Sequence, residues 1–293
     1  MFVTKRILLS FLCASVLTHC AVAQRTNDTR GASSFEEQVD IGGRRLHINC
    51  MGENVEGSPT VVLETGLGDS SSVWNRVQPE VAKFVRVCSY DRAGLGGSEP
   101  APVPRTIEAV VADLHTLLAN AKVPSPYVLV GHSLGGILAR LYASRYPKEV
   151  VGMVLVDSAH EDEPDRGLAL LPVEMLKQSK PEDFVIHHPR ESVDHCSIRA
   201  LMNAANWHSN IPLLVLTQGR PYNPNDYPTP SLAAKFYQFH LEMQKDLVRR
   251  SPRGKQVIAE KSGHNVHQDQ PELVIDAIRQ VVEGVKSTRN EKR

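Results

Sequence analysis

The chain lacks an excess of charge of either sign, with 33 Lys and Arg against 33 Asp and Glu among 293 residues. A nucleic-acid partner usually requires clustered basic charge, so the balance excludes a polyanion as the expected partner. Beyond the first two dozen positions, no apolar run is long enough to span a bilayer. There is also no C-x-x-C spacing to indicate a zinc site, and no internal repeat or low-complexity linker divides the chain. The length is sufficient for one large domain with a substantial core.

The first residues have the pattern of a signal peptide. Lys5 and Arg6 precede a short apolar run, and small residues at 21–23 suit cleavage after Ala23. Removing residues 1–23 would leave 270 residues with 31 basic and 33 acidic side chains, and no transmembrane segment. The sequence therefore predicts a secreted or periplasmic protein. A lipoprotein signal with the lipid on Cys20 is the alternative, but the bulky His19 fits it poorly.

Cysteine is scarce, and after cleavage only three would remain of the five: Cys50, Cys88 and Cys196. An exported protein permits a disulfide, and an odd number leaves one thiol unpaired. Cys50 and Cys88 each end a strand-like segment. Whether they pair depends on whether those two strands are neighbours.

Short β-branched runs alternate with longer segments of helical period. The expected strands cover residues 35–41, 45–50, 60–64, 84–89, 127–130, 151–156, 213–217 and 256–260. Several are continuous apolar runs, which is typical of strands buried on both faces of a parallel sheet. Amphipathic helices are expected after Thr106 as N-cap, from Leu134 to before Pro147, and from Pro271. The alternation predicts an α/β fold with helices on both faces of a mostly parallel sheet.

One stretch, residues 158–210, interrupts this alternation because it is rich in charge, His and Pro and has no clear strand. We interpret it as an insertion that forms a lid over a site, with a solvated loop as the alternative. The chain would then be one domain over residues 35–286, with a flexible tail at 287–293.

A candidate nucleophile, Ser133, lies in the G-x-S-x-G segment from Gly131 to Gly135. This segment directly follows an expected strand and opens an expected helix, which is the context of a nucleophile elbow. A serine hydroxyl is a weak nucleophile at neutral pH and needs a base oriented by an acid. We therefore expect nucleophilic catalysis at Ser133.

His264 is the expected base, because it follows the last strand and would lie with Ser133 at the carboxyl edge of the sheet. His267 is the second choice. For the acid, Asp157 ends the strand after that of the nucleophile, and Asp226 lies in the loop after the following strand. Pro221 occupies the earliest position for an acid in that loop, which favours Asp157 over Asp226.

An oxyanion hole needs two preorganised backbone N–H groups. Leu134, the residue after the nucleophile, would supply one. The other would come from the glycine-rich turn at 65–69, most simply from Leu67.

Taken together, these motifs resemble those of the α/β-hydrolase superfamily over essentially the whole mature chain. The matching segments, in order, are Leu63 to Gly68, Tyr90 to Ser98, Gly131 to Gly136, and Gly263-His264. The resemblance implies an eight-stranded sheet of order 1-2-4-3-5-6-7-8, with the lid insertion between strands six and seven. It also places Cys50 beside Cys88, so that a disulfide is expected, with Cys196 free in the lid.

The sequence departs from the family pattern at two points. Thr65-Gly66 stands where many relatives have His-Gly, so no histidine side chain acts there. The acid is not at its common spacing after strand seven, but some lipase-like relatives place it after strand six, where Asp157 stands. Asp91 and Arg92 resemble the structural turn of the family and are not expected to be catalytic.

The resemblance implies a serine hydrolase that cleaves carboxylic esters through an acyl-enzyme, with a small-molecule ester or amide as substrate and no metal or organic cofactor. Haloalkane dehalogenases share the fold but use an aspartate nucleophile, so Ser133 argues against that reaction. One alternative is a proline-iminopeptidase-like aminopeptidase, which would need a lid carboxylate such as Glu161, Asp162, Glu163 or Glu174. Another is a ligand-binding member without catalysis.

Overall fold

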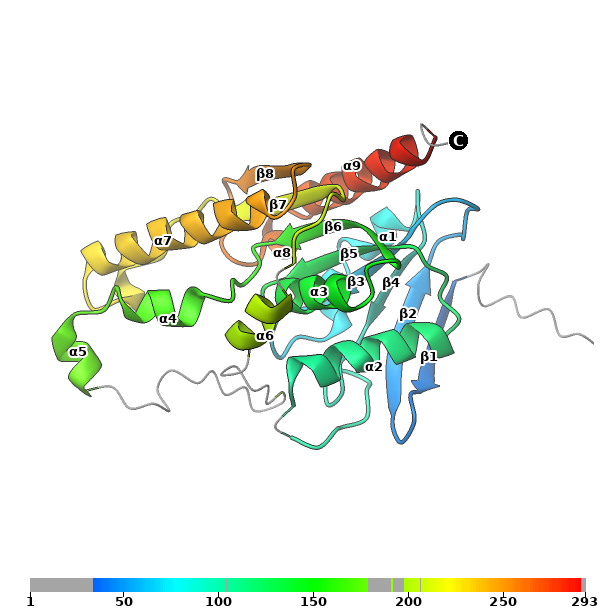
Figure 1. Cartoon of the computed structure of the whole chain (residues 1–293), viewed down its shortest axis with the longest axis horizontal. Helices are drawn as coiled ribbons and strands as arrows, with labels where there is room; N and C mark the ends of the chain where they lie inside the picture. Colours follow the sequence, from blue (N-terminus) through cyan, green and yellow to red (C-terminus); the bar gives the residue numbers. More distant parts are fainter. Residues whose placement is uncertain (1–33, 104, 179–190, 192–197, 206, 291–293) are drawn as a thin grey trace, which may run out of the picture.

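The computed structural model describes residues 34–103, 105–178, 191, 198–205 and 207–290 (Figure 1). The predicted signal peptide at 1–23, including Cys20, lies outside the described residues, and so does Cys196. None of the helices formed by the described residues is long and apolar enough to cross a membrane.

Eight strands form one sheet in the order β1-β2-β4-β3-β5-β6-β7-β8, which confirms the order implied by the resemblance. The pairs β1–β2 and β2–β4 are antiparallel, and the other five pairs are parallel. The strands are β1 Phe35–Asp40, β2 Arg45–Met51, β3 Thr60–Glu64, β4 Val87–Tyr90, β5 Tyr127–His132, β6 Val150–Val156, β7 Leu213–Gln218 and β8 Gly254–Ala259.

One predicted strand boundary is wrong. The apolar run from Phe84 predicts a strand start, but the amides of Phe84 and Val85 both donate to the carbonyl of Val81, at 3.1 Å each. These residues therefore complete the turn after a short helix, and β4 begins only at Val87. The other predicted strand boundaries agree with the structure to within two residues.

Helices cover both faces of the sheet and create two cores (Figure 1). One core packs α2 and α3 on the sheet, and the other packs α1, α8 and α9 on its opposite face. The helices are η2 Ser71–Trp74, α1 Gln78–Val81, α2 Ile107–Asn120, α3 Leu134–Arg145, α4 Glu163–Leu168, α5 Val173–Gln178, α6 Ile198–Ala205, η4 Pro224–Asp226, α7 Pro230–Arg249, α8 Val266–Asp269 and α9 Pro271–Asn290.

The predicted helix starts agree with the structure. Thr106 caps α2, with its side chain accepting a hydrogen bond from the Ala109 amide, and Pro271 is the first residue of α9. The other end of α9 differs from the expectation, because the helix continues to Asn290, beyond the predicted start of a flexible tail at residue 287. The apolar period of α9 reaches Val285, and the polar residues after it continue the same helix.

The segment between β6 and β7 contains α4, α5 and α6, at the place predicted for the insertion at 158–210. Part of it lies outside the described residues. In Figure 1, α4 and α5 extend beyond the sheet beneath α7, which itself runs past the sheet edge. The insertion therefore adds helices and no strand to the sheet among the described residues.

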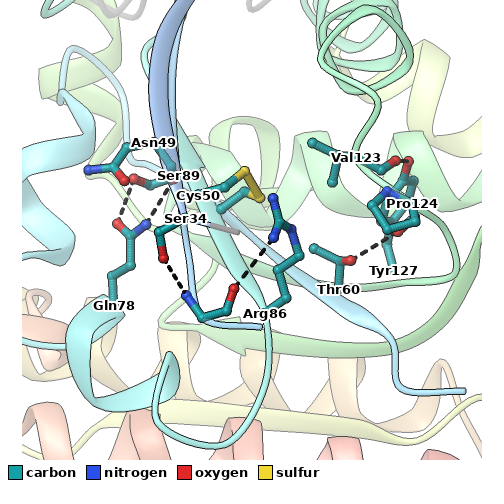
Figure 2. Close-up of a disulfide and its surroundings, with 12 residues drawn as sticks. Ser34, Asn49, Cys50, Thr60, Gln78, Arg86, Ser89, Val123, Pro124 and Tyr127 are labelled. Atoms are coloured by element: carbon teal, nitrogen blue, oxygen red, sulfur yellow. Dashed lines mark hydrogen bonds between the residues drawn. A yellow bond between two sulfur atoms is a disulfide. The ribbon is translucent and has the colours of Figure 1, made fainter. Parts of the chain in front are cut away.

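Cys50 and Cys88 form a disulfide between the antiparallel neighbours β2 and β4 (Figure 2). Both residues are buried. Beside the disulfide, the side chain of Gln78 bonds to both strands: it donates to the Asn49 carbonyl at 2.9 Å and accepts from the Ser89 hydroxyl at 2.7 Å. The pairing that the resemblance implied is thus present in the structure.

Candidate active site

Ser133 occupies a strained turn between β5 and α3. Its backbone has φ 52° and ψ −121°, and it is the N-cap residue of α3. Few non-glycine residues adopt a positive φ, and such strain is concentrated at functional sites. The side chain of the N-cap makes no capping hydrogen bond, and Ser133 is partly exposed. The turn therefore presents the hydroxyl at the carboxyl edge of the sheet.

Two glycines make this turn possible. A Cβ on Gly131 would lie 2.4 Å from the carbonyl oxygen of Gly135, and a Cβ on Gly135 would lie 2.6 Å from the carbonyl oxygens of Glu64 and Thr65. Because these neighbours are backbone atoms, they cannot move aside as a flexible side chain could. The G-x-S-x-G spacing is thus required for the strand, the turn and the helix to approach each other.

His264 and Asp157 meet at the same edge. The Nδ1 atom of His264 lies 2.7 Å from Oδ2 of Asp157, and the His264 side chain is half exposed whereas that of Asp157 is fully buried. Asp157 has φ 43°, and its Oδ1 accepts a hydrogen bond from the Gln218 amide at 2.9 Å. Burial alone would raise the pKa of Asp157, but hydrogen bonds from His240 and His264 lower it to about 2. The carboxylate is therefore ionised at neutral pH and fixed in orientation.

The structure does not bring the alternative acid, Asp226, to His264. It ends the short helix η4, and its carboxylate accepts a hydrogen bond from the Asn223 side chain at 3.3 Å. Asp226 is exposed. Its role in the structure is local to its own loop.

The alternative base, His267, is fully buried. Its ring packs between those of Trp74 and His132, with centroid distances of 4.7 and 4.4 Å. Neither of its ring nitrogens has a hydrogen-bond partner among the described residues. Burial, together with the nearby His264, lowers the pKa of His267 to about 4. We therefore assign it to the packing beneath the His264 loop.

His132 binds the backbone of the loop that carries His264. Its Nε2 lies 3.0 Å from the carbonyl oxygen of His264, so the ring nitrogen must carry the proton that it donates. Burial, followed by the proximity of His264 and His267, holds the pKa of His132 well below its ordinary value. A neutral His132 thus fixes the backbone of the candidate base.

The glycine-rich turn from Thr65 to Asp69, here called the oxyanion turn, follows β3 at this edge. Within the described part of the chain, the amides of Leu67 and Leu134 have no hydrogen-bond partner. Leu134 is the first residue of α3, where backbone amides are normally unpaired and the helix dipole favours negative charge. Neither of these two amides is therefore used by another described residue.

Sequence reasoning missed two buried residues that contact this site. His240, in the middle of α7, places Nε2 2.9 Å from Oδ1 of Asp157. Glu191, from the segment between β6 and β7, accepts a hydrogen bond from the Gly68 amide at 2.8 Å. Neither residue belongs to a local sequence motif, so the sequence gives no signal for them. They stand out only in the structure, as polar side chains that are buried at the site.

Asp91 and Arg92 are arranged differently from each other. Asp91 accepts from the amides of Ser71 at 2.6 Å and Gly97 at 2.8 Å, which is the structural role predicted for it. Arg92 points instead toward the oxyanion turn.

Among the described residues, no group of three or more His, Cys, Asp or Glu side chains could hold a metal ion.

Comparison with known proteins agrees with this architecture. A family model described as "alpha/beta hydrolase fold" matches residues 59–258. An uncharacterized protein of Bacillus subtilis, YqjL, is 31% identical over 246 residues, which are 83% of this chain and 90% of that protein. In three further curated relatives, the match spans 18%, 26% and 21% of the relative's own length.

Two solved structures share the fold at low identity. An esterase from Thermogutta terrifontis has 21% identity and a TM-score of 0.59, with 87% of this chain and 100% of that chain covered. Est816, described as an N-acyl homoserine lactone degrading enzyme, has 17% identity and a TM-score of 0.60, with 84% of this chain and 100% of that chain covered.

Proposed function

The chain belongs to the α/β-hydrolase family, and from this premise we propose that it is a serine hydrolase that cleaves carboxylic esters through an acyl-enzyme. The observation that carries the proposal is the contact of His264 Nδ1 with the buried Asp157 carboxylate, at 2.7 Å, on the edge where Ser133 occupies a strained turn. Asp157 fixes the imidazole so that Nε2 is free to accept the Ser133 proton.

In this mechanism, Ser133 Oγ attacks the ester carbonyl while His264 takes its proton. The negative charge that develops on the carbonyl oxygen is stabilised by the amides of Leu67 and Leu134. The tetrahedral intermediate then expels the alcohol, which receives the proton from His264. A water molecule, activated by His264, hydrolyses the acyl-enzyme and restores Ser133.

The state of the insertion carboxylates limits the aminopeptidase alternative to the ester assignment. An aminopeptidase needs an uncommitted carboxylate to hold the substrate amine. Glu161 is buried and paired with Arg140 at 2.5 Å and with Arg250 at 2.8 Å, and Asp162 pairs with Arg199 at 3.1 Å. Two of the four candidates are thus already occupied, so an aminopeptidase would have to use Glu163 or Glu174. Turnover of proline anilides without turnover of nitrophenyl esters would contradict this choice.

A fluorophosphonate probe tests the mechanism directly, because it reacts only with an activated serine. We expect intact protein to be labelled at Ser133 and Ser133→Ala to be neither labelled nor active on p-nitrophenyl butyrate. Asp157→Asn should lower kcat by about a factor of 10³ or more, as loss of a triad acid does. Asp226→Asn is the matched control and should change kcat little. A non-catalytic binding protein would resist the probe.

Location and domain organisation complete the proposal. The disulfide between Cys50 and Cys88 supports export, because such bonds persist in oxidising compartments. We infer cleavage after Ala23, a single domain over residues 35–286, and an insertion at about 158–210 that acts as a lid. Mass spectrometry of the mature N-terminus after expression with the native leader would test the cleavage site.

A further inference from the structure

The side chain of Arg92 is fully buried and reaches the oxyanion turn from β4's end. Its Nη2 donates to the Gly66 carbonyl at 2.5 Å, and its Nη1 donates to the Thr65 carbonyl at 2.9 Å and the Thr65 hydroxyl at 2.8 Å. These contacts hold two successive carbonyl oxygens of the turn. No other described cation contacts those oxygens.

Because a peptide unit is planar, the contact between Arg92 and the Gly66 carbonyl also sets the direction of the Leu67 N–H. The Gly66 carbonyl and the Leu67 N–H belong to one peptide unit, which is planar and trans, so the two bonds point in opposite directions. With the carbonyl oxygen of Gly66 held by the guanidinium, the Leu67 N–H must point away from Arg92. A flipped peptide would exchange the donor for a carbonyl oxygen and lose the contact with Arg92.

The next peptide unit is held by Glu191. The Oε2 atom of Glu191 accepts from the Gly68 amide at 2.8 Å, which fixes the plane that follows Leu67. The same carboxylate also binds Arg92, with Oε1 2.6 Å from Nε and Oε2 2.8 Å from Nη2. The peptides on both sides of Leu67 are therefore anchored by one buried ion pair.

We propose that Arg92 and Glu191 are positioning residues that hold the Leu67 amide in the orientation of an oxyanion donor; this inference rests on the proposed hydrolase function. Glu191 belongs to the segment between β6 and β7, so the insertion contributes a structural part of the oxyanion hole. Neither side chain needs to touch the substrate. Their effect is on the transition state, where charge develops on the carbonyl oxygen.

The charges around Arg92 support a stable arrangement. Burial would lower the pKa of Arg92, but Glu191 and Glu64 raise it above its ordinary value, so the guanidinium stays charged. Glu64 also contacts Nη1 of Arg92 at 2.6 Å. Two carboxyl groups thus face one guanidinium, and Glu191→Gln would leave the contact of Arg92 with Glu64 in place. Variants at Glu191 should therefore fold.

The test compares wild-type protein with Glu191→Gln, Glu191→Asp and Arg92→Lys on p-nitrophenyl butyrate. Glutamine lacks the second acceptor oxygen, aspartate is one methylene too short, and lysine lacks the planar fork that reaches both carbonyls. We expect each variant to lower kcat by about 10- to 100-fold with KM within about threefold of wild type, somewhat less than deletion of an oxyanion donor. A trifluoromethyl ketone, which forms a hemiketal oxyanion on Ser133, should lose affinity in parallel with kcat/KM.

Asp113→Asn is the matched control, because Asp113 is likewise a carboxylate paired with arginine, Arg44 at 2.8 Å and Arg105 at 2.5 Å, but lies on α2. It should lower thermal stability without changing kcat. The proposal is overturned if the folded Glu191 variants keep kcat within about threefold of wild type, or if only KM changes while ketone affinity is kept. Failure of the proposed function would be seen separately, as wild-type protein that fluorophosphonate does not label.

Discussion

The carboxylate of Asp157 is bound by two histidines, one on each oxygen: His264 Nδ1 lies 2.7 Å from Oδ2, and His240 Nε2 lies 2.9 Å from Oδ1. His240 is buried on α7, which runs past the sheet edge. Burial lowers the pKa of His240, but the hydrogen bond and the charge of Asp157 raise it above its ordinary value, and Glu163 adds to this. His240 is therefore more readily protonated than a free histidine, and it faces the candidate acid on the side away from the candidate base.

We expect His240 to affect catalysis in two separable ways, through its hydrogen bond and through its charge. His240→Phe removes both, and should lower kcat about tenfold because Asp157 is less well fixed. His240→Gln places an amide nitrogen near the position of Nε2, and should keep most of kcat. In both variants the acid limb of the pH profile of kcat/KM should move upward by about 0.5–1 pH unit, since the nearby positive charge is gone.

Steady-state kinetics from pH 5 to pH 9 would measure both effects. An identical loss of kcat in the Phe and Gln variants would show that the hydrogen bond is not what matters. An unmoved acid limb in both would show that His240 is neutral in the active protein.

A second prediction concerns stability at mildly acidic pH. The unfolded chain binds a proton on His267 below about pH 6.5, whereas the folded protein does so only near its lowered pKa of about 4. Protons therefore favour the unfolded state as the pH falls from 6.5 to 4. At pH 5, the His267 contribution to the free energy of unfolding should be lower than at pH 7 by about 2 kcal/mol.

Urea unfolding of His267→Phe at pH 7 and pH 5 would test this. The ring would still pack between Trp74 and His132, and no hydrogen bond is lost because neither nitrogen has a partner among the described residues. We expect the variant to lie within about 1 kcal/mol of wild type at pH 7 and to exceed it at pH 5. A pH dependence equal to that of wild type would contradict the assignment to His267.

A third prediction compares a glycine that is tightly surrounded by backbone, Gly135, with one that has space for a side chain, Gly284. A Cβ at Gly135 would lie 2.6 Å from the carbonyl oxygens of Glu64 and Thr65, so Gly135→Ala must push α3 away from the oxyanion turn. We expect kcat to fall by about 100-fold or more, since small displacements at a reacting site cost this much. Gly284→Ala is the control, because the nearest atom to its Cβ would be 3.7 Å away, and replacement of a helical glycine should add about 0.5–1 kcal/mol of stability.

How far the sequence predicts this molecule depends on whether a feature is local. Ser133 and its flanking glycines form one continuous motif, and the structure places that motif in a strand, turn and helix as predicted. The strand order was implied only by the family resemblance that several such motifs carry, and the structure has that order. By contrast, Phe84 and Val85 are apolar enough for a strand, but their amides are used by the turn after α1.

The residues that sequence reasoning missed act across long separations. His240 lies 83 residues from Asp157, and Glu191 lies 123 residues from Gly68. Nothing near either residue in the sequence distinguishes it from the other polar residues of a surface helix or a charged segment. Their burial results from how α7 and the insertion pack against the sheet edge, and that packing is a property of the fold as a whole.

The disulfide supports the last prediction. Cys50 and Cys88 close a loop with a sequence separation of 38 residues, between two strands that are already neighbours in the sheet. Because the bond mainly restricts the unfolded chain, its removal in Cys50→Ala/Cys88→Ala should cost about 3–4 kcal/mol of unfolding free energy. The side chains are buried, so small cavities add to this cost. Urea unfolding of the double variant beside wild type, each with and without a reducing agent, would measure it. Reduction should lower the urea midpoint of wild type and leave the midpoint of the variant unchanged. Thiol titration would establish that both cysteines are reduced. If the wild-type midpoint is then the same with and without the reductant, the bond contributes little to stability.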